Sequence, residues 1–199
     1  MAPQTRAAKR VAAAAGGGGA ASDAEEEKVR LSLYGRTLRR FPLLVNAFQA
    51  ALLSASSQLL AQYLGGTAPA AFDYAPAAQF ALISAAVVTP VSTFFFACVG
   101  KLKLKTPASL ALDFFVGGPV LNCAFIAALH LVQGRGTDAV VESLTSKAFW
   151  TEMVLGSNKV WLPAKVVMYT VIPVVYWNLW CSVVSFGWGI ILATLVADT

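Results

Sequence analysis

The most informative scarcity in this 199-residue chain is charge. Asp, Glu, Lys and Arg make up 13% of the residues, about half the share usual in soluble domains. Only Asp113 among the acidic residues lies inside a long apolar run. With 57% hydrophobic residues, a water-soluble fold would leave too much apolar surface unburied. The shortage of charge therefore excludes an ordinary soluble domain and indicates an integral membrane protein.

Histidine and cysteine are too few for the common metal and disulfide chemistries. His130 is the single histidine, and we expect a polar cap at the membrane interface rather than a ligand. Cys98, Cys123 and Cys181 have no close-spaced partner, which excludes a disulfide framework and a zinc site. Paired carboxylates, a Ser-His-Asp set and a phosphate-binding glycine loop are also missing. The sequence therefore predicts no catalytic site, metal site or cofactor.

Long apolar runs are what the chain has in abundance. Four of them, each close to the roughly 20 residues that cross a bilayer as a helix, cover residues 41–64, 76–99, 109–132 and 174–196. They predict an all-α integral membrane fold with four transmembrane helices. Pro90 and Pro119 lie inside the second and third runs. We expect both helices to be kinked there, with the freed carbonyls facing protein or a nearby hydroxyl.

The segments outside the runs complete the predicted architecture. Residues 1–28 read as a disordered or targeting tail, and residues 29–199 as a single four-helix membrane domain. An amphipathic surface helix should precede the first span, with an apolar face made of Leu31, Leu33, Tyr34 and Leu38. Another should precede the fourth span, as a surface helix and an interfacial segment within residues 143–172. A fifth crossing in that stretch is the alternative topology.

Positive charge gathers on one side of the predicted bundle. Cations precede the first span and follow the second, whereas residues 65–75 between them contain no Lys or Arg. This asymmetry puts the amino terminus and the Lys-rich loop on the positive side, which is the matrix or stroma in an organelle inner membrane. The net charge of +5 is explained by topology and lipid headgroups. No basic helix interleaved with aromatics indicates a nucleic-acid partner.

Polar residues inside the spans have two interpretations. In the first span Asn46, Ser54, Gln58 and Gln62 recur with small residues at three- and four-residue steps along one face. Such a face can wall an aqueous path, but we favour packing between helices. Asp113 has no cation close to it in the sequence. We favour a structural acid near the start of its helix, where the dipole favours an anion, over a functional one.

Single residues also recur along the spans in a distinctive order. They are Tyr34, Leu38, Pro42, Gln62, Pro90, Ser92, Phe95, Phe96, Leu102, Asp113, Pro119, Trp161, Pro163, Tyr169, Pro173, Tyr176 and Trp188. This pattern resembles the Mpv-seventeen and twenty-two-kilodalton peroxisomal membrane protein family from about residue 34 to residue 193. The resemblance implies a four-span helical protein of an organelle membrane, with proposed channel activity in the family and no catalytic site.

The chain departs from the family pattern at its intramembrane polar positions. Ser57 and Gln58 stand where the pattern has a Gly-Asp pair, and Phe114 replaces the Gln that follows Asp113. Charged and polar groups in spans usually mark ion or proton pathways. Their loss weakens the interpretation of this chain as a channel.

We therefore expect a non-catalytic accessory or structural subunit of a larger membrane complex. Its partners would be membrane lipids and other membrane protein subunits, with pigments or tightly bound lipid as further candidates. A small-solute or ion channel is the alternative. The expected location is an organelle membrane, with the mitochondrial inner membrane preferred to the peroxisomal and chloroplast membranes.

Overall fold

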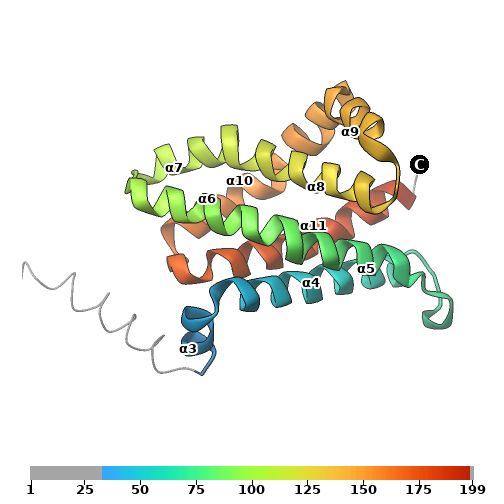
Figure 1. The fold of residues 1–199 in the computed structure, drawn as a ribbon, viewed down its shortest axis with the longest axis horizontal. Helices are drawn as coiled ribbons and strands as arrows, with labels where there is room; N and C mark the ends of the chain where they lie inside the picture. Colours follow the sequence, from blue (N-terminus) through green and yellow to red (C-terminus); the bar gives the residue numbers. More distant parts are fainter. Residues whose placement is uncertain (1–32, 198–199) are drawn as a thin grey trace, which may run out of the picture. The chain divides into compact units, whose positions relative to one another are not determined.

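The computed structural model describes the backbone of residues 33–197 and the side chains of residues 33–191 other than residue 152. All regular structure in this part of the chain is helical, which confirms the predicted fold class (Figure 1). The chain divides into two compact units, Met1–Pro42 and Leu43–Thr199. The tail predicted for residues 1–28 lies outside the described residues.

In the first unit the described helix is α3, Leu33–Arg40. It ends on Arg39 and Arg40, cations that favour the negative end of the helix dipole. The guanidinium of Arg40 lies 5.2 Å from the centre of the Phe41 ring. Leu38 is buried, whereas Leu33 is exposed, so the two leucines predicted to share one apolar face are in different environments.

Four helical runs are long and apolar enough to cross a membrane, as predicted. They are Pro42–Leu64 (α4), Tyr74–Leu102, Thr106–Val132 and Val174–Ile191. The second run consists of α5 (Tyr74–Ile83), η2 (Ser84–Val88) and α6 (Thr89–Leu102). The third consists of α7 (Thr106–Leu112), η3 (Asp113–Gly117) and α8 (Gly118–Val132), and the fourth of η5 (Val174–Tyr176) and the first part of α11 (Trp177–Ala197).

The prolines inside the second and third runs follow short π-helical segments. η2 ends two residues before Pro90, and η3 ends two residues before Pro119. A proline has no amide hydrogen and crowds the carbonyl four residues earlier, so a wider turn relieves the clash. The Thr89 hydroxyl donates a hydrogen bond to the Ser84 carbonyl at 2.7 Å. The same carbonyl also accepts from the Thr89 amide, so this hydroxyl is a second donor to it and not the partner of a carbonyl freed by Pro90.

Short turns join the helices of the second unit. Asp73 caps α5 by accepting a hydrogen bond from the Ala75 amide at 2.9 Å. Lys103 ends α6 with a φ of 48°, a left-handed conformation typical of a helix terminus. Gly134 and Gly136 have positive φ in the turn that leads from α8 to α9 (Gly136–Thr145).

The chain then returns along the third run through η4 (Phe149–Gly156) and α10 (Asn158–Thr170). η4 contacts α8, whereas α10 contacts α7 and α11, so this segment is antiparallel to the third run (Figure 1). The inner face of α10 is buried, and Met168 is completely enclosed beside Phe96, Val99 and Trp177. One face of α10 therefore packs against the bundle, and α10 is not among the four helical runs long and apolar enough to cross a membrane.

Candidate functional site

An ion pair is buried between the third run and α10. The Lys165 Nζ atom lies 2.8 Å from the Asp113 Oδ2 atom, and the two side chains are 10% and 5% exposed. The helix that carries Asp113 begins at Thr106, about two turns earlier, which is beyond the first turn where the helix dipole acts. The anion is therefore held by a cation rather than by a helix terminus. Sequence reasoning missed this partner.

Further side chains complete the surroundings of the pair. The Tyr169 hydroxyl donates a hydrogen bond to Asp113 Oδ2 at 2.8 Å. Lys165 Nζ lies 4.7 Å from the centre of the Phe96 ring and 5.7 Å from that of Trp161, within the range of a cation–π interaction. It also lies 3.7 Å from the Cys181 sulfur. The carboxylate of Asp113 thus has both a cation and a hydroxyl as partners, inside a core lined by aromatic rings and a thiol.

Pairing explains how these charges are tolerated in a membrane protein. A single charged side chain near the centre of a spanning helix costs about 2.5–3.5 kcal/mol on insertion scales. Asp113 and Lys165 together are neutral, and the Tyr169 hydrogen bond uses another acceptor position of the carboxylate. Such a cluster can hold the third run and α10 in one arrangement. If these two helices moved apart, two opposite charges would be exposed.

Gly117 provides the space for this cluster. A Cβ atom built at this position would lie 2.7 Å from the Phe95 ring and 2.8 Å from Asp113 Oδ1. Both distances are shorter than van der Waals contact. The absence of a side chain at Gly117 therefore lets α6 approach η3 beside the carboxylate.

The polar face of the first span contacts other helices. The hydroxyls of Ser54 and Ser84 lie 2.7 Å apart and join α4 to η2. The Ser57 hydroxyl donates to the Phe186 carbonyl of α11 at 3.1 Å. A Cβ atom at Gly189 would collide with the Ser57 hydroxyl, so α4 and α11 approach closely there.

The other predicted polar residues of this span have different surroundings. Gln62 donates to the Asp73 carbonyl at 2.7 Å and accepts from the Asp73 amide at 2.8 Å, which closes the loop after α4. Asn46 is buried, and its Oδ1 atom has no partner among the described residues. Gln58 is half-buried, and the structure assigns it no contact with Asp113. The predicted polar residues therefore do not converge on one site.

A second polar contact joins α6 and α11. The Ser92 hydroxyl donates to Asn178 Oδ1 at 2.9 Å, and Asn178 Nδ2 donates to the Thr93 hydroxyl at 3.3 Å. Ser92 also lies 3.1 Å from the Thr89 carbonyl. Hydrogen bonds of this kind between spanning helices are worth about 0.6–2 kcal/mol each.

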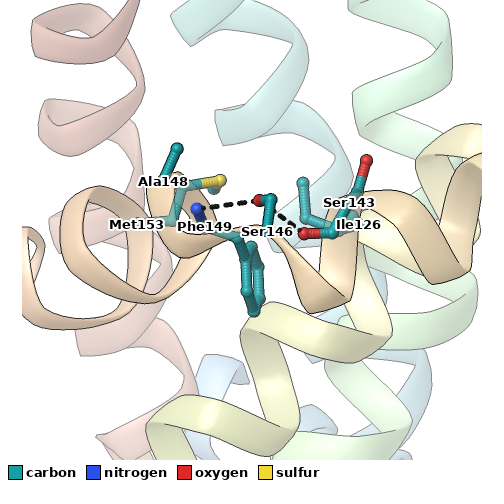
Figure 2. A pocket seen from close by; sticks show the side chains of 6 residues that line it. All are labelled: Ile126, Ser143, Ser146, Ala148, Phe149 and Met153. Atoms are coloured by element: carbon teal, nitrogen blue, oxygen red, sulfur yellow. Dashed lines mark hydrogen bonds between the residues drawn. The ribbon is translucent and has the colours of Figure 1, made fainter.

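His130 joins α8 to α9 at the end of the third span. Its Nε2 atom lies 2.7 Å from the Ser143 hydroxyl, and its Nδ1 atom is buried without a partner among the described residues. Beside them is a small cavity of about 240 Å³, lined by Ile126, Ser143, Ser146, Ala148, Phe149 and Met153 (Figure 2). The Ser146 hydroxyl donates to the Ser143 carbonyl at 2.8 Å and accepts from the Phe149 amide at 3.1 Å. The Ser146 hydroxyl is therefore occupied by backbone partners at the turn before η4.

The remaining residues of the family pattern lie at helix ends or inside helices. Pro42 is the first residue of α4, and Pro173 precedes η5, so neither interrupts a helix. Pro163 lies inside α10, and Trp161 faces Lys165. Tyr176 ends η5, and Trp188 is half-buried within α11. In the described part of the chain no group of three or more His, Cys, Asp or Glu side chains is arranged to hold a metal ion.

Comparisons with known proteins agree with this architecture. Residues 130–193 match the model of the Mpv17 / PMP22 family. Peroxisomal membrane protein 2 of Bos taurus is 26% identical over 175 residues, which cover 83% of this chain and 88% of that protein. PXMP2/4 family protein 4 of Dictyostelium discoideum is 25% identical, covering 84% and 94%, and Protein SYM1 of Gibberella zeae is 25% identical, covering 78% and 91%. No solved structure matches the chain.

The helices and their buried polar contacts define a multi-pass α-helical membrane protein. Within that class, the chain is similar to the Mpv17 / PMP22 family, through the match of residues 130–193 to the family model and through three relatives of 25–26% identity. The resemblance found in the spacing of single residues is thereby confirmed.

Proposed function

We propose that this protein is a non-catalytic accessory subunit of a larger complex in an organelle membrane. The observation that carries the proposal is that intramembrane polar groups are used in contacts between helices. Asp113 and Lys165 neutralise each other, Ser54 meets Ser84, and Ser57 meets the α11 backbone. An aqueous conduit would need polar side chains left available along its wall.

The outer surface is suited to contacts with lipid and with other membrane proteins. Large apolar side chains are well exposed on several helices, among them Phe48 on α4, Phe94 on α6 and Phe115 on η3, each more than 70% exposed. Aromatic rings provide large contact areas at low entropic cost. Pigments or tightly bound lipid would also suit this surface.

An organelle membrane is supported by the relatives, since one of them carries the name peroxisomal membrane protein 2. Among organelles we propose the mitochondrial inner membrane first. Co-fractionation of the tagged protein with mitochondrial, peroxisomal and chloroplast markers separates the three alternatives.

Gentle solubilisation tests the assignment as a subunit. The tagged full-length chain, extracted from its own membrane with digitonin, should migrate on a native gel in a complex far larger than one 21.0 kDa chain in its micelle. It should return to the mass of a single chain after treatment with a harsher detergent. A monomeric peak in digitonin as well would overturn the proposal.

A small-solute or ion channel is the second candidate, because a charged pair lies inside the bundle. If the Asp113–Lys165 pair closes a path, then purified protein in planar bilayers should conduct, and Asp113→Asn should change its open probability or ion selectivity. Electrically silent bilayers with folded protein, for the wild type and this variant, would refute the channel.

A further inference from the structure

One face of the returning helical segment combines aliphatic side chains with a single lysine. Lys159, Leu162 and Val166 follow each other at steps of three and four residues within α10, which places them on one helix face, and Leu155 lies about one turn earlier in η4. All four are exposed. The opposite face of α10 carries the buried residue Met168. The α10 stripe, as we call these four exposed residues, therefore faces away from the bundle.

The depth of Lys159 follows from the buried ion pair. Asp113 lies seven residues after Thr106, about 10 Å along the third run at 1.5 Å per residue. Lys165 is level with Asp113 because their charged atoms are 2.8 Å apart. Since α10 is antiparallel to α7, the six residues from Lys165 back to Lys159 add about 9 Å. Lys159 is then level with Pro119, the middle of the 27-residue run Thr106–Val132.

At this depth Lys159 cannot satisfy its charge with lipid headgroups. The centre of the hydrocarbon is roughly 15 Å from either boundary, which is much further than the four-carbon stem of a lysine reaches. Its side chain is exposed, and no hydrogen bond or ion pair joins it to any described residue. An uncompensated charge in the middle of a span is expensive and usually marks a functional contact.

We infer that the α10 stripe docks against a membrane-spanning helix of another protein that carries an Asp or Glu carboxylate opposite Lys159. This inference rests on the proposed role as a subunit and names the surface and the partner chemistry. The aliphatic side chains on either side of Lys159 pack against the partner helix and exclude lipid and water, which strengthens the ion pair.

A second copy of this chain does not supply the carboxylate from its spans. Asp113 is the single acidic residue in the four candidate spans, and it is buried against Lys165. Glu152 of the returning segment lies seven residues before Lys159, about 10 Å along the helix, so a second copy in the same membrane orientation does not bring it level with Lys159. The partner helix therefore belongs to a different protein. A carboxylate is favoured over a hydroxyl, because an anion compensates the charge of the ammonium and forms a stronger, charge-assisted hydrogen bond.

Substitution of the lysine within the native complex tests this inference. The full-length variants Lys159→Met and Lys159→Glu are compared with Lys159→Arg and with Lys101→Met, which removes an exposed lysine from the end of α6. The fraction of the chain in the digitonin-stable complex should fall by roughly tenfold or more in the first two. It should be retained in Lys159→Arg and Lys101→Met. Membrane integration, followed by carbonate extraction, should be unchanged in all four.

Photocrosslinking identifies the partner helix and adds a second criterion. A photoreactive residue at Leu162 should crosslink to a protein segment that contains an Asp or Glu, whereas one at Phe94, exposed on α6, serves as a control outside the stripe. Replacing that acid by Lys should restore the complex of Lys159→Glu. If Lys159→Met assembles like the wild type, or the crosslinked segment has no acid, the inference is overturned while the proposed role as a subunit stands. Absence of a complex in the wild type overturns both.

Discussion

Removal of one partner of the Asp113–Lys165 pair should destabilise the bundle strongly. Asp113→Asn preserves the shape of the side chain but leaves Lys165 facing Phe96, Trp161 and Cys181 without a counter-charge. An unpaired charge left by breaking a buried ion pair costs about 3–5 kcal/mol. For a chain of this size 1 kcal/mol corresponds to about 2–4 °C in melting temperature. The expected decrease in Tm is therefore about 6–20 °C.

The assay is thermal unfolding in mild detergent, followed by tryptophan fluorescence or loss of the monodisperse peak. Lys165→Met should give a loss of similar size, because it leaves the carboxylate with only the Tyr169 hydroxyl. The double variant Asp113→Asn, Lys165→Met contains no buried charge and should be more stable than either single variant. Lys147→Met, at an exposed position outside the four spans, is the control and should change Tm little.

A double-mutant cycle decides the result. The reasoning is refuted if the losses of the two single variants add up in the double variant, since independent sites are additive and a charge pair is not. It is refuted equally if both single variants melt within 2 °C of the wild type, a margin of about 1 kcal/mol or less.

Three further predictions concern packing, topology and the first loop. Gly189→Ala should lower Tm by several degrees, because the added methyl group would collide with Ser57. Gly187→Ala is the control and should have little effect, because its methyl group meets nothing within 4 Å. Equal effects of the two substitutions would contradict the close approach of α4 and α11. If the η4–α10 segment crosses the membrane as a fifth pass, a tag at the carboxyl terminus should be protected from protease on the side where a tag in the 103–105 turn is cleaved, because an odd number of passes from that turn puts them on opposite sides. Cleavage of both tags from one side would exclude a fifth crossing. Gln62→Leu removes two hydrogen bonds to the backbone of the following loop, which should reduce the free energy that holds this loop closed by about 1–3 kcal/mol. The loop should then be cleaved faster by protease. An unchanged cleavage rate would show that the two bonds are not needed.

Hydropathy predicted the fold class because the membrane imposes a strong rule on sequence. Every spanning segment must be helical and about 20 residues long, so four apolar runs gave four spans whose starts differ by at most three residues from those observed. The π-helical turns before Pro90 and Pro119 were foreseen only as kinks. The form of a distortion depends on how neighbouring helices accommodate it, which single-sequence periodicity does not contain.

The buried ion pair was missed for a different reason. Asp113 and Lys165 are far apart in sequence, and Lys165 lies in a segment whose mixed composition predicted a surface position. A signal was nevertheless present, since a lone acid in one span and a cation among apolar residues in another segment each need an opposite charge. Matching such unpaired charges across segments would have suggested the contact.

The π turn at Ser84–Val88 sets the rotational phase of the second run. Ser84, at its start, faces Ser54 of α4, whereas Ser92, beyond it, faces Asn178 of α11. One residue corresponds to about 100° of helix rotation. Because a π turn takes up one extra residue, deleting a single alanine from it would restore an ordinary α-helical repeat and leave the later side chains, Ser92 included, on their present faces. An added residue that the turn could not take up would rotate Ser92 by that angle, away from α11. The π turn thus accommodates one additional residue while the later part of the second run keeps its contact with α11 through Ser92.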